Sequence, residues 1–307
     1  MLDRFRFKVP LRAVWNVPES TETLWWPAVE GSEKNMVVLF IPGNPGLVDY
    51  YEPFFNVLYD AFDGHVEIVG VSHLGHSPGP HNPPSHHDRV YSLAEQIQHK
   101  VRCLDELIAT RPKGTRFVLI GHSVGAYISG EVLREREQYV QKVIALFPTV
   151  YEIGKTPNGA KLSPLFYRFP RMMLSYGCDL LRALLPSVVF LHLVRTLTGQ
   201  TSPGLEVTAH KLLNGHVLRN VLYMAHNEML EIKELDEIFY RASSEKLIFY
   251  YSSVDSWAPE AHHHRMLELL ASGGMVHLCP DNIPHAFTFR HADVLGKRVA
   301  EWLKKLD

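Results

Sequence analysis

The stretch from Phe117 to Gly125 constrains the fold of this chain more than any other. An apolar run, Phe117-Val118-Leu119-Ile120, leads into Gly121-His122-Ser123-Val124-Gly125, and a proline-free segment follows from Ala126 to Arg134. The apolar run predicts a buried strand, and the segment after the second glycine predicts a helix. A serine between two glycines on a strand–turn–helix connection is typical of a nucleophile elbow. We therefore predict that Ser123 is a nucleophile and that the Val124 N–H faces the same site.

Further apolar runs predict the rest of a sheet and the helices that cover it. Because the predicted strands alternate with segments of helical periodicity, the chain belongs to the α/β class, with a mostly parallel, doubly wound sheet. Apolar residues make up 46% of the 307 residues, which is enough for a large core. The other strands are expected at residues 36–41, 66–72, 140–150, 245–254 and 275–279, and the main helices at 51–62, 93–110 and 292–306.

Residues 151–240 interrupt this alternation, because no strand pattern occurs between the strand expected at 140–150 and the one expected at 245–254. We interpret residues 1–150 and 241–307 as the core and residues 151–240 as an inserted helical cap. The order of elements resembles the α/β-hydrolase fold, in which caps are inserted at this position.

A serine hydroxyl needs a base, and the base needs an acid that orients it. In the fold that the chain resembles, the order is serine, acid, histidine. Asp255 follows a predicted strand and His285 lies in the loop before the closing helix, so we predict a Ser123–Asp255–His285 triad. Other candidates are Glu152 and Asp281 for the acid and His291 for the base.

The loop Pro42-Gly43-Asn44-Pro45-Gly46 follows the first predicted strand of the sheet and is expected to complete an oxyanion hole. Pro45 has no N–H group to donate. We therefore predict that the Asn44 N–H and the Val124 N–H hold the oxyanion. Gly121 and Gly125 allow the close approach that the elbow needs.

Five motifs resemble the lipid-droplet-associated hydrolase family, and they lie in the family's order along nearly the whole chain. The resemblance implies a lipid-ester substrate, a sterol ester or acylglycerol, and a location on lipid droplets and the cytosolic face of the endoplasmic reticulum. It also implies an alternative, a droplet-binding or droplet-organising protein with weak or vestigial hydrolase activity. The motifs are Ile41-Pro42-Gly43-Asn44-Pro45-Gly46, Gly121-His122-Ser123-Val124-Gly125, Phe147-Pro148-Thr149, Pro157-Asn158-Gly159 and Asn282-Ile283-Pro284-His285-Ala286-Phe287.

Residues 162–197 are unusually apolar, and Pro186 interrupts them. The apolar runs on either side are shorter than the roughly 20 residues that a membrane-spanning helix needs. Between residues 161 and 200 the only acid is Asp179, and the basic residues are Lys161, Arg168, Arg171, Arg182 and Arg195. A basic-rimmed apolar hairpin is suited to one leaflet or a phospholipid monolayer. The alternative is an ordinary cap whose apolar face packs on the core.

The remaining features predict no metal, cofactor, nucleic acid or secretory leader. The net charge is −2, which gives no electrostatic basis for binding nucleic acid. The first twenty residues contain no long apolar stretch, so we expect a protein that is not secreted. The three cysteines, Cys103, Cys178 and Cys279, are widely spaced and expected to be reduced.

Two groups of histidines are candidate metal sites. Adjacent histidines on a helix point about 100° apart, so His262-His263-His264 predicts a solvated helix face rather than a metal site. The second group has only Asp88 as a nearby carboxylate, and its first part resembles the loop that follows this strand in many α/β hydrolases. Its members are His73, His76, His81, His86 and His87.

Overall fold

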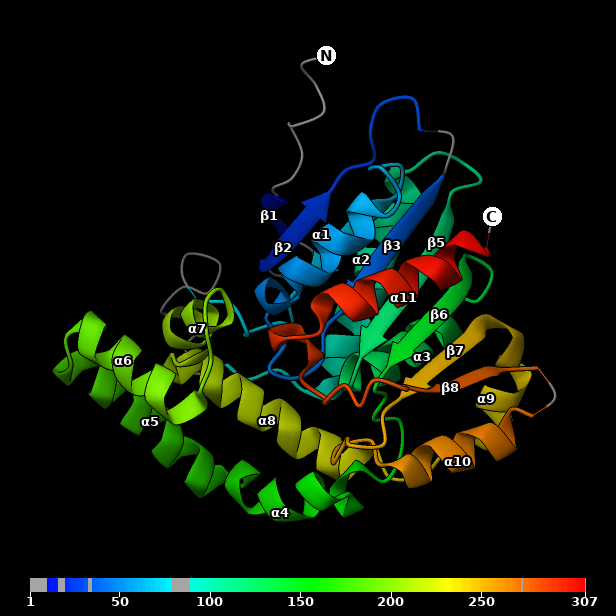
Figure 1. Cartoon of the computed structure of the whole chain (residues 1–307). Coiled ribbons are helices and arrows are strands. Elements are labelled where there is room, and N and C mark those ends of the chain that lie inside the picture. The colour runs from blue at the N-terminus through cyan, green and yellow to red at the C-terminus, as the bar shows by residue number, and fades with distance from the viewer. Residues whose placement is uncertain (1–9, 16–19, 33–34, 79–88, 272, 307) are drawn as a thin grey trace.

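The computed structural model describes residues 10–15, 20–32, 35–78, 89–271 and 273–306 (Figure 1). At its centre is an eight-stranded sheet in the order β1-β2-β4-β3-β5-β6-β7-β8. The strands are β1 (Leu11–Trp15), β2 (Thr21–Trp26), β3 (Met36–Ile41), β4 (Glu67–Val71), β5 (Arg116–His122), β6 (Val140–Leu146), β7 (Leu247–Tyr251) and β8 (Met275–Leu278).

The strands from β4 to β8 in this order are paired in parallel, which confirms the predicted α/β class. Parallel strands end at the same edge of a sheet, so the residues after β3, β5 and β7 lie near one another. The central strands are buried on both faces, which explains their unbroken apolar runs.

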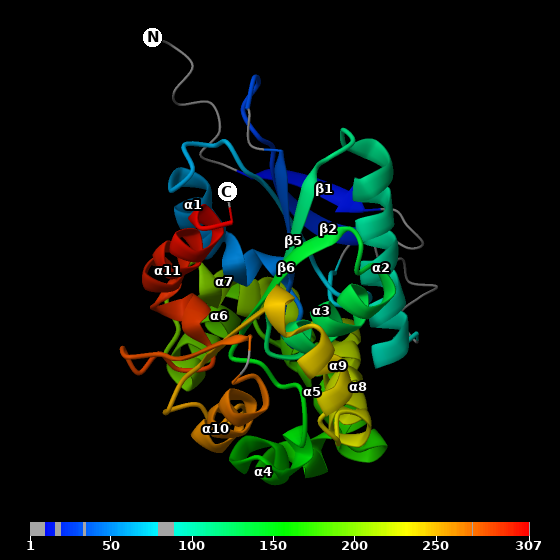
Figure 2. The same cartoon turned by 90° about the vertical axis from the view of Figure 1, so that its right-hand side faces the viewer.

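Helices cover both faces of the sheet, as Figure 2 shows from the side. One face packs on α1 (Glu52–Asp60) and α11 (Ala292–Lys304), and the other on α2 (Leu93–Thr110), α3 (Val124–Glu135) and α10 (Glu260–Leu269). The alternation of β3 sends Val38 and Phe40 into the first core and Val37 and Leu39 into the second. Three short 3-10 turns lie at the edges of these layers: η1 (Val48–Tyr51), η5 (Ser244–Lys246) and η6 (Phe287–Phe289).

Two features of the sheet differ from the sequence prediction. Strands β1 and β2 were not predicted, and they form an antiparallel extension at the edge. Strand β6 was predicted to reach residue 150 but ends at Leu146, because Phe147 has a φ of +47°, which a strand cannot contain. The Phe147 N–H instead donates to the Tyr250 carbonyl at 2.7 Å.

The segment between β6 and β7 is helical, and we propose it, at residues 151–240, as the cap segment. Its long helices lie together in the lower part of Figure 1, apart from α1 and α11. The helical elements of the segment are η3 (Ile153–Lys155), α4 (Pro157–Phe166), α5 (Arg168–Leu184), α6 (Ser187–Thr198), α7 (Gly204–Val207), the π-helical turn η4 (Thr208–Leu212), α8 (Gly215–Glu231) and α9 (Glu237–Ala242).

Candidate active site

Ser123 occupies the sharp turn between β5 and α3. Its φ of +55° and ψ of −124° are rare for a residue with a side chain. The turn requires the two flanking glycines, because a Cβ on Gly121 would lie 2.3 Å from the Gly125 carbonyl oxygen. A Cβ on Gly125 would lie 2.2 Å from the Ile41 carbonyl oxygen. The strained backbone and the close packing are what a nucleophile elbow needs.

The structure brings Ser123, His285 and Asp255 into one hydrogen-bonded chain. The His285 Nε2 lies 2.9 Å from the Ser123 Oγ, and its Nδ1 lies 2.6 Å from the Asp255 Oδ2. Asp255 follows β7, and His285 lies in the loop between β8 and η6. Three loops at the carboxyl edge of the sheet therefore bring the three residues together, and their catalytic roles stay a prediction.

The second oxygen of Asp255 fixes its orientation. Oδ1 accepts hydrogen bonds from the Trp257 N–H at 2.7 Å and the Ala258 N–H at 3.0 Å. Burial acts to raise the pKa of Asp255, but the adjacent His285 and the two N–H groups outweigh it and the pKa is lowered. An ionised Asp255 accepts a hydrogen bond from the His285 Nδ1–H, so Nε2 carries no proton and can accept the proton of the Ser123 hydroxyl.

The other candidates for the acid and the base have partners or positions outside this hydrogen-bonded chain. Glu152 forms an ion pair with Lys155, and its main-chain N–H donates to the Lys233 carbonyl at 3.0 Å. Asp281 is exposed, and His291 precedes the first turn of α11.

The loop after β3 lies directly against the elbow. The approach is so close that a Cβ on Gly43 would lie 2.9 Å from the Ser123 Cβ. The Asn44 side chain is turned away toward α8, where Nδ2 donates to the Val221 carbonyl and to the Glu228 Oε1, each at 2.9 Å. Both amide hydrogens are thus used, and only the main-chain N–H of Asn44 remains for an oxyanion. The Val124 N–H begins α3 and has no intrahelical acceptor. The Asn44–Val124 oxyanion hole stays a prediction.

Two buried histidines support this loop, a role that the sequence analysis missed. The His73 Nε2–H donates to the Pro42 carbonyl at 2.9 Å, and the His76 Nδ1–H donates to the Pro45 carbonyl at 2.6 Å. Burial lowers the pKa of His73 well below its ordinary value and the pKa of His76 to about 3, so both rings are neutral.

Among the described residues no three His, Cys, Asp or Glu side chains are grouped as metal ligands. His81, His86 and His87 lie outside the described residues. The interpretation of His262-His263-His264 as a solvated helix face was wrong for two residues, since His262 and His263 are buried and His262 stacks on Tyr151. The three cysteines are free and buried.

His122, inside the elbow motif, connects the loop after β3 to the His285 loop. The Gly43 N–H donates to the Tyr51 hydroxyl at 3.0 Å, and that hydroxyl lies 2.7 Å from the His122 Nδ1. The Tyr51 hydroxyl therefore donates to Nδ1, and the His122 Nε2–H donates to the His285 carbonyl at 3.0 Å. Burial lowers the pKa of His122 to about 3, which suits this neutral tautomer. The sequence shows that His122 lies beside the nucleophile, but it does not show that Tyr51, 71 residues earlier, is its hydrogen-bond partner.

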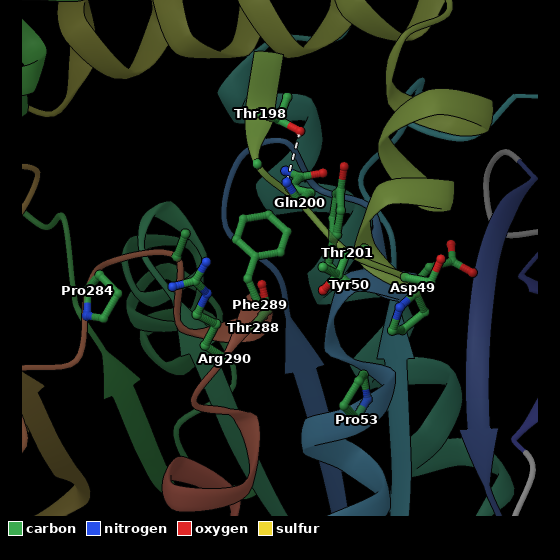
Figure 3. A pocket seen from close by; sticks show the side chains of 15 residues that line it. Asp49, Tyr50, Pro53, Thr198, Gln200, Thr201, Pro284, Thr288, Phe289 and Arg290 are labelled. Carbon is green, nitrogen blue, oxygen red and sulfur yellow. Dashed lines mark hydrogen bonds between the residues drawn. The ribbon is translucent and has the colours of Figure 1, made fainter. Parts of the chain in front are cut away.

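A cavity of about 300 Å³ lies beside the His285 loop, between the core and the cap segment (Figure 3). Tyr50 and Phe289 form one wall, and residues 198–204, between α6 and α7, form another. Pro284 and Ala286, on either side of His285, also line it. Ser123 itself is only 6% exposed. Ser123 is not among the described residues that line the cavity, so the cavity lies beside the His285 loop without including the nucleophile.

Known proteins resemble this chain in sequence and in fold. A sequence model for the family described as "Lipid-droplet associated hydrolase" matches residues 34–288. Proteins named lipid droplet-associated hydrolase are similar: the Mus musculus protein is 31% identical, with 89% of this chain and 86% of the relative aligned. The Dictyostelium discoideum protein is also 31% identical, with 88% of each aligned.

Solved structures share the fold at low sequence identity. A thermophilic esterase from Thermogutta terrifontis superposes with a TM-score of 0.62 and 14% identity, over 96% of this chain and 98% of that one. The haloalkane dehalogenase DbeA from Bradyrhizobium elkani gives a TM-score of 0.67 and 13% identity, over 96% and 97%. These likenesses confirm an α/β-hydrolase fold.

Proposed function

This chain belongs to the lipid-droplet-associated hydrolase family, and on that premise we propose that it is a serine hydrolase that cleaves lipid esters, of the sterol ester or acylglycerol class, at a droplet surface. The observation that carries the proposal is the continuous chain from the Ser123 Oγ through His285 to Asp255. Such a chain is the arrangement that activates a serine hydroxyl for acyl transfer.

The proposed reaction has two halves. The Ser123 Oγ attacks the ester carbonyl while His285 takes its proton, and the Asn44 and Val124 N–H groups stabilise the oxyanion. The C–O bond to the alcohol then breaks, and His285 returns the proton to the departing alcohol. Water then attacks the acyl-serine carbonyl while His285 takes one of its protons, and the C–O bond to Ser123 breaks as His285 returns that proton to the Ser123 Oγ, which releases the acid. Asp255 stabilises the imidazolium in both halves.

The residue at the elbow supports this reaction over those of two other α/β hydrolase classes. Haloalkane dehalogenases and epoxide hydrolases use an aspartate at the elbow, whereas this chain has Ser123. The similarity in fold to DbeA therefore does not extend to its chemistry.

Labelling with a fluorophosphonate probe tests the nucleophile. We expect the probe to modify the wild-type protein and not Ser123→Ala, because only an activated serine attacks the phosphorus. Labelling of the variant at the wild-type rate would contradict the assignment. No labelling of either protein would favour the alternative function, a droplet-binding or droplet-organising protein with vestigial activity.

The exposed apolar surface of α5 and α6 favours contact with a membrane or droplet surface. The outer faces of α5 and α6 expose large apolar side chains, among them Leu184 (69% exposed), Val188 (80%) and Leu197 (76%). Within the described residues, no helix is long and apolar enough to cross a membrane. We propose that this face, within residues 162–197, lies in a phospholipid monolayer, on droplets and on the cytosolic face of the endoplasmic reticulum.

The expected basic rim of this segment is smaller than the sequence indicated. Arg171 is buried, and Arg182 donates to the Ala209 carbonyl at 2.6 Å and the Leu213 carbonyl at 3.0 Å. The exposed basic residues of the segment are Lys161, Arg168 and Arg195. Apolar contact therefore provides most of the proposed affinity, and charge provides less.

A further inference from the structure

Glu228, on α8 of the cap segment, is a buried carboxyl group that the proposed reaction does not use. It is 4% exposed, and within the described part of the chain no Lys, Arg or His forms an ion pair with it. Its one hydrogen-bond partner there is the Asn44 Nδ2, at 2.9 Å. A buried acid without a cation is costly, and such groups occur most often where they have a function.

The contact reaches the loop that we propose as half of the oxyanion hole. Two acceptors on α8, the Val221 carbonyl and the Glu228 carboxyl, bind the two amide hydrogens of Asn44. Both amide hydrogens of the Asn44 side chain are thereby held by α8, and its buried Oδ1 has no hydrogen-bond partner among the described residues. A side chain held at both amide hydrogens also restrains the backbone to which it is attached.

Helix α8 is itself attached firmly to the core. The Asn220 Oδ1 accepts from the Tyr91 N–H at 3.1 Å, and the Asn227 Oδ1 accepts from the Leu93 N–H at 3.3 Å. These two contacts hold α8 near the start of α2. Glu228 thus extends from an anchored helix, which is what a precise positioning contact requires.

We propose that Glu228 is a positioning residue, which holds the Asn44 side chain so that the Asn44 N–H faces the developing oxyanion. This inference rests on the proposed function. The cap segment would then determine the geometry of the oxyanion hole as well as cover it. Burial raises the pKa of Glu228 to about 8, with the Asn44 hydrogen bond opposing the shift, so at pH 7 the group is a neutral acceptor. A glutamine, which is also neutral and has the same shape, should serve in its place.

Three variants test this role with a soluble 4-nitrophenyl ester and with the rate of fluorophosphonate labelling. Glu228→Leu removes the acceptor but keeps most of the volume, and we expect kcat and the labelling rate to fall about 10- to 100-fold. KM should change less than about threefold, since substrate binding does not depend on the oxyanion contact. Glu228→Gln should restore both rates to within about threefold of wild type.

Glu231→Leu is the matched control, because Glu231 is a carboxyl group one turn further along the same helix, is exposed, and among the described residues makes no hydrogen bond to Asn44. It should leave kcat and the labelling rate within about threefold. Wild-type rates in Glu228→Leu, or an equal loss in Glu228→Leu and Glu228→Gln, would overturn the inference. So would an equal loss of kcat in Glu231→Leu. A wild-type protein that the probe does not label would overturn the proposed function, and this inference with it.

Discussion

At the scale of single residues, the two ring nitrogens of His285 have different partners, and this difference determines the proposed chemistry. Asp255 accepts from Nδ1, so Nε2 is the nitrogen that faces Ser123. An amide at position 255 can present an N–H to Nδ1 and so favour the opposite tautomer, in which Nε2 carries the proton and cannot act as a base.

We therefore expect Asp255→Asn to lower kcat by up to about 10,000-fold while the fold stays intact. Steady-state kinetics with the 4-nitrophenyl ester and circular dichroism measure the two effects. Glu152→Gln is the control, because Glu152 pairs with Lys155 rather than with His285. Near-normal activity of Asp255→Asn together with a loss in Glu152→Gln would mean that Glu152 is the acid.

The carboxyl group of Glu228 also predicts a dependence of stability on pH. Its pKa rises from an ordinary value of 4.5 to about 8 on folding, mainly by burial. Between these values the folded state holds a proton that the unfolded state has lost, so this group makes stability fall as pH rises. The loss of stability caused by Glu228 therefore develops between about pH 4.5 and pH 8. It is small at pH 4 and nearly complete at pH 9.

Glu228→Gln removes this titration, so the variant should match wild type in free energy of unfolding near pH 4.5 and exceed it by on the order of a few kcal/mol at pH 9. Denaturant unfolding of both proteins at several pH values measures the difference, in which all other titrating groups cancel. A difference that does not change with pH would show that Glu228 is ionised in the folded protein.

At the scale of elements, α5 and α6 have an inner and an outer apolar side. Phe190 and Val194 of α6 pack on Leu205 and Ala209 and form a small separate core. Leu184, Val188 and Leu197 point outward. The outward side is the one that a monolayer would cover, and substitutions there need not disturb the small core.

Replacing Leu184, Val188 and Leu197 together with aspartate should release the protein from droplets, because charges in hydrocarbon cost a few kcal/mol each. Flotation of cell extracts measures the release. A matched control places aspartates at Ile238 and Leu267, which are also exposed but lie on α9 and α10, at the far end of Figure 1 from α6. If the triple variant floats as wild type does, the outward side is an ordinary protein surface.

The elements that the sequence predicted well are those with strong local patterns. The strand at 36–41 and the helix at 93–110 have the predicted bounds, because apolar runs and helical periodicity are local properties. Strands β1 and β2 were missed since β1 is largely exposed and the inward residues of β2 include Thr21 and Thr23. Strand β2 is stabilised by pairing with β4, which is distant in sequence, and β1 by pairing with β2.

The same distinction applies to the candidate site. Ser123, Asp255 and His285 follow from the order of motifs along the chain, and the structure brings them together. The supporting contacts could not be predicted, because each joins distant segments: Tyr51 to His122, and Asn44 to Glu228. The identity of a residue indicates what it can donate or accept, but its partner depends on the packing of the whole chain.

At the scale of the whole molecule, the proposed lipid surface and the proposed active site are made by different residues. Ser123 lies at the sheet edge, whereas the exposed apolar residues lie on α5 and α6. Ser123→Ala should therefore float with droplets as wild type does. The aspartate triple variant should retain fluorophosphonate labelling in solution within about threefold. Loss of labelling in that variant, with its circular dichroism unchanged, would mean that the two functions are coupled.

The long connection between β6 and β7 has a consequence for how the protein reaches its native state. These strands pair in parallel, yet residues 147–246 separate them along the chain. Bringing them together requires a large loop to close, and pairings so distant in sequence form slowly. During synthesis the elbow emerges early, whereas β7 and β8, which precede Asp255 and His285, emerge only after the whole helical insertion. The nascent chain therefore holds Ser123 without the two residues proposed to activate it until the helical insertion is complete, and the proposed reactivity arises only when the last strands join the sheet.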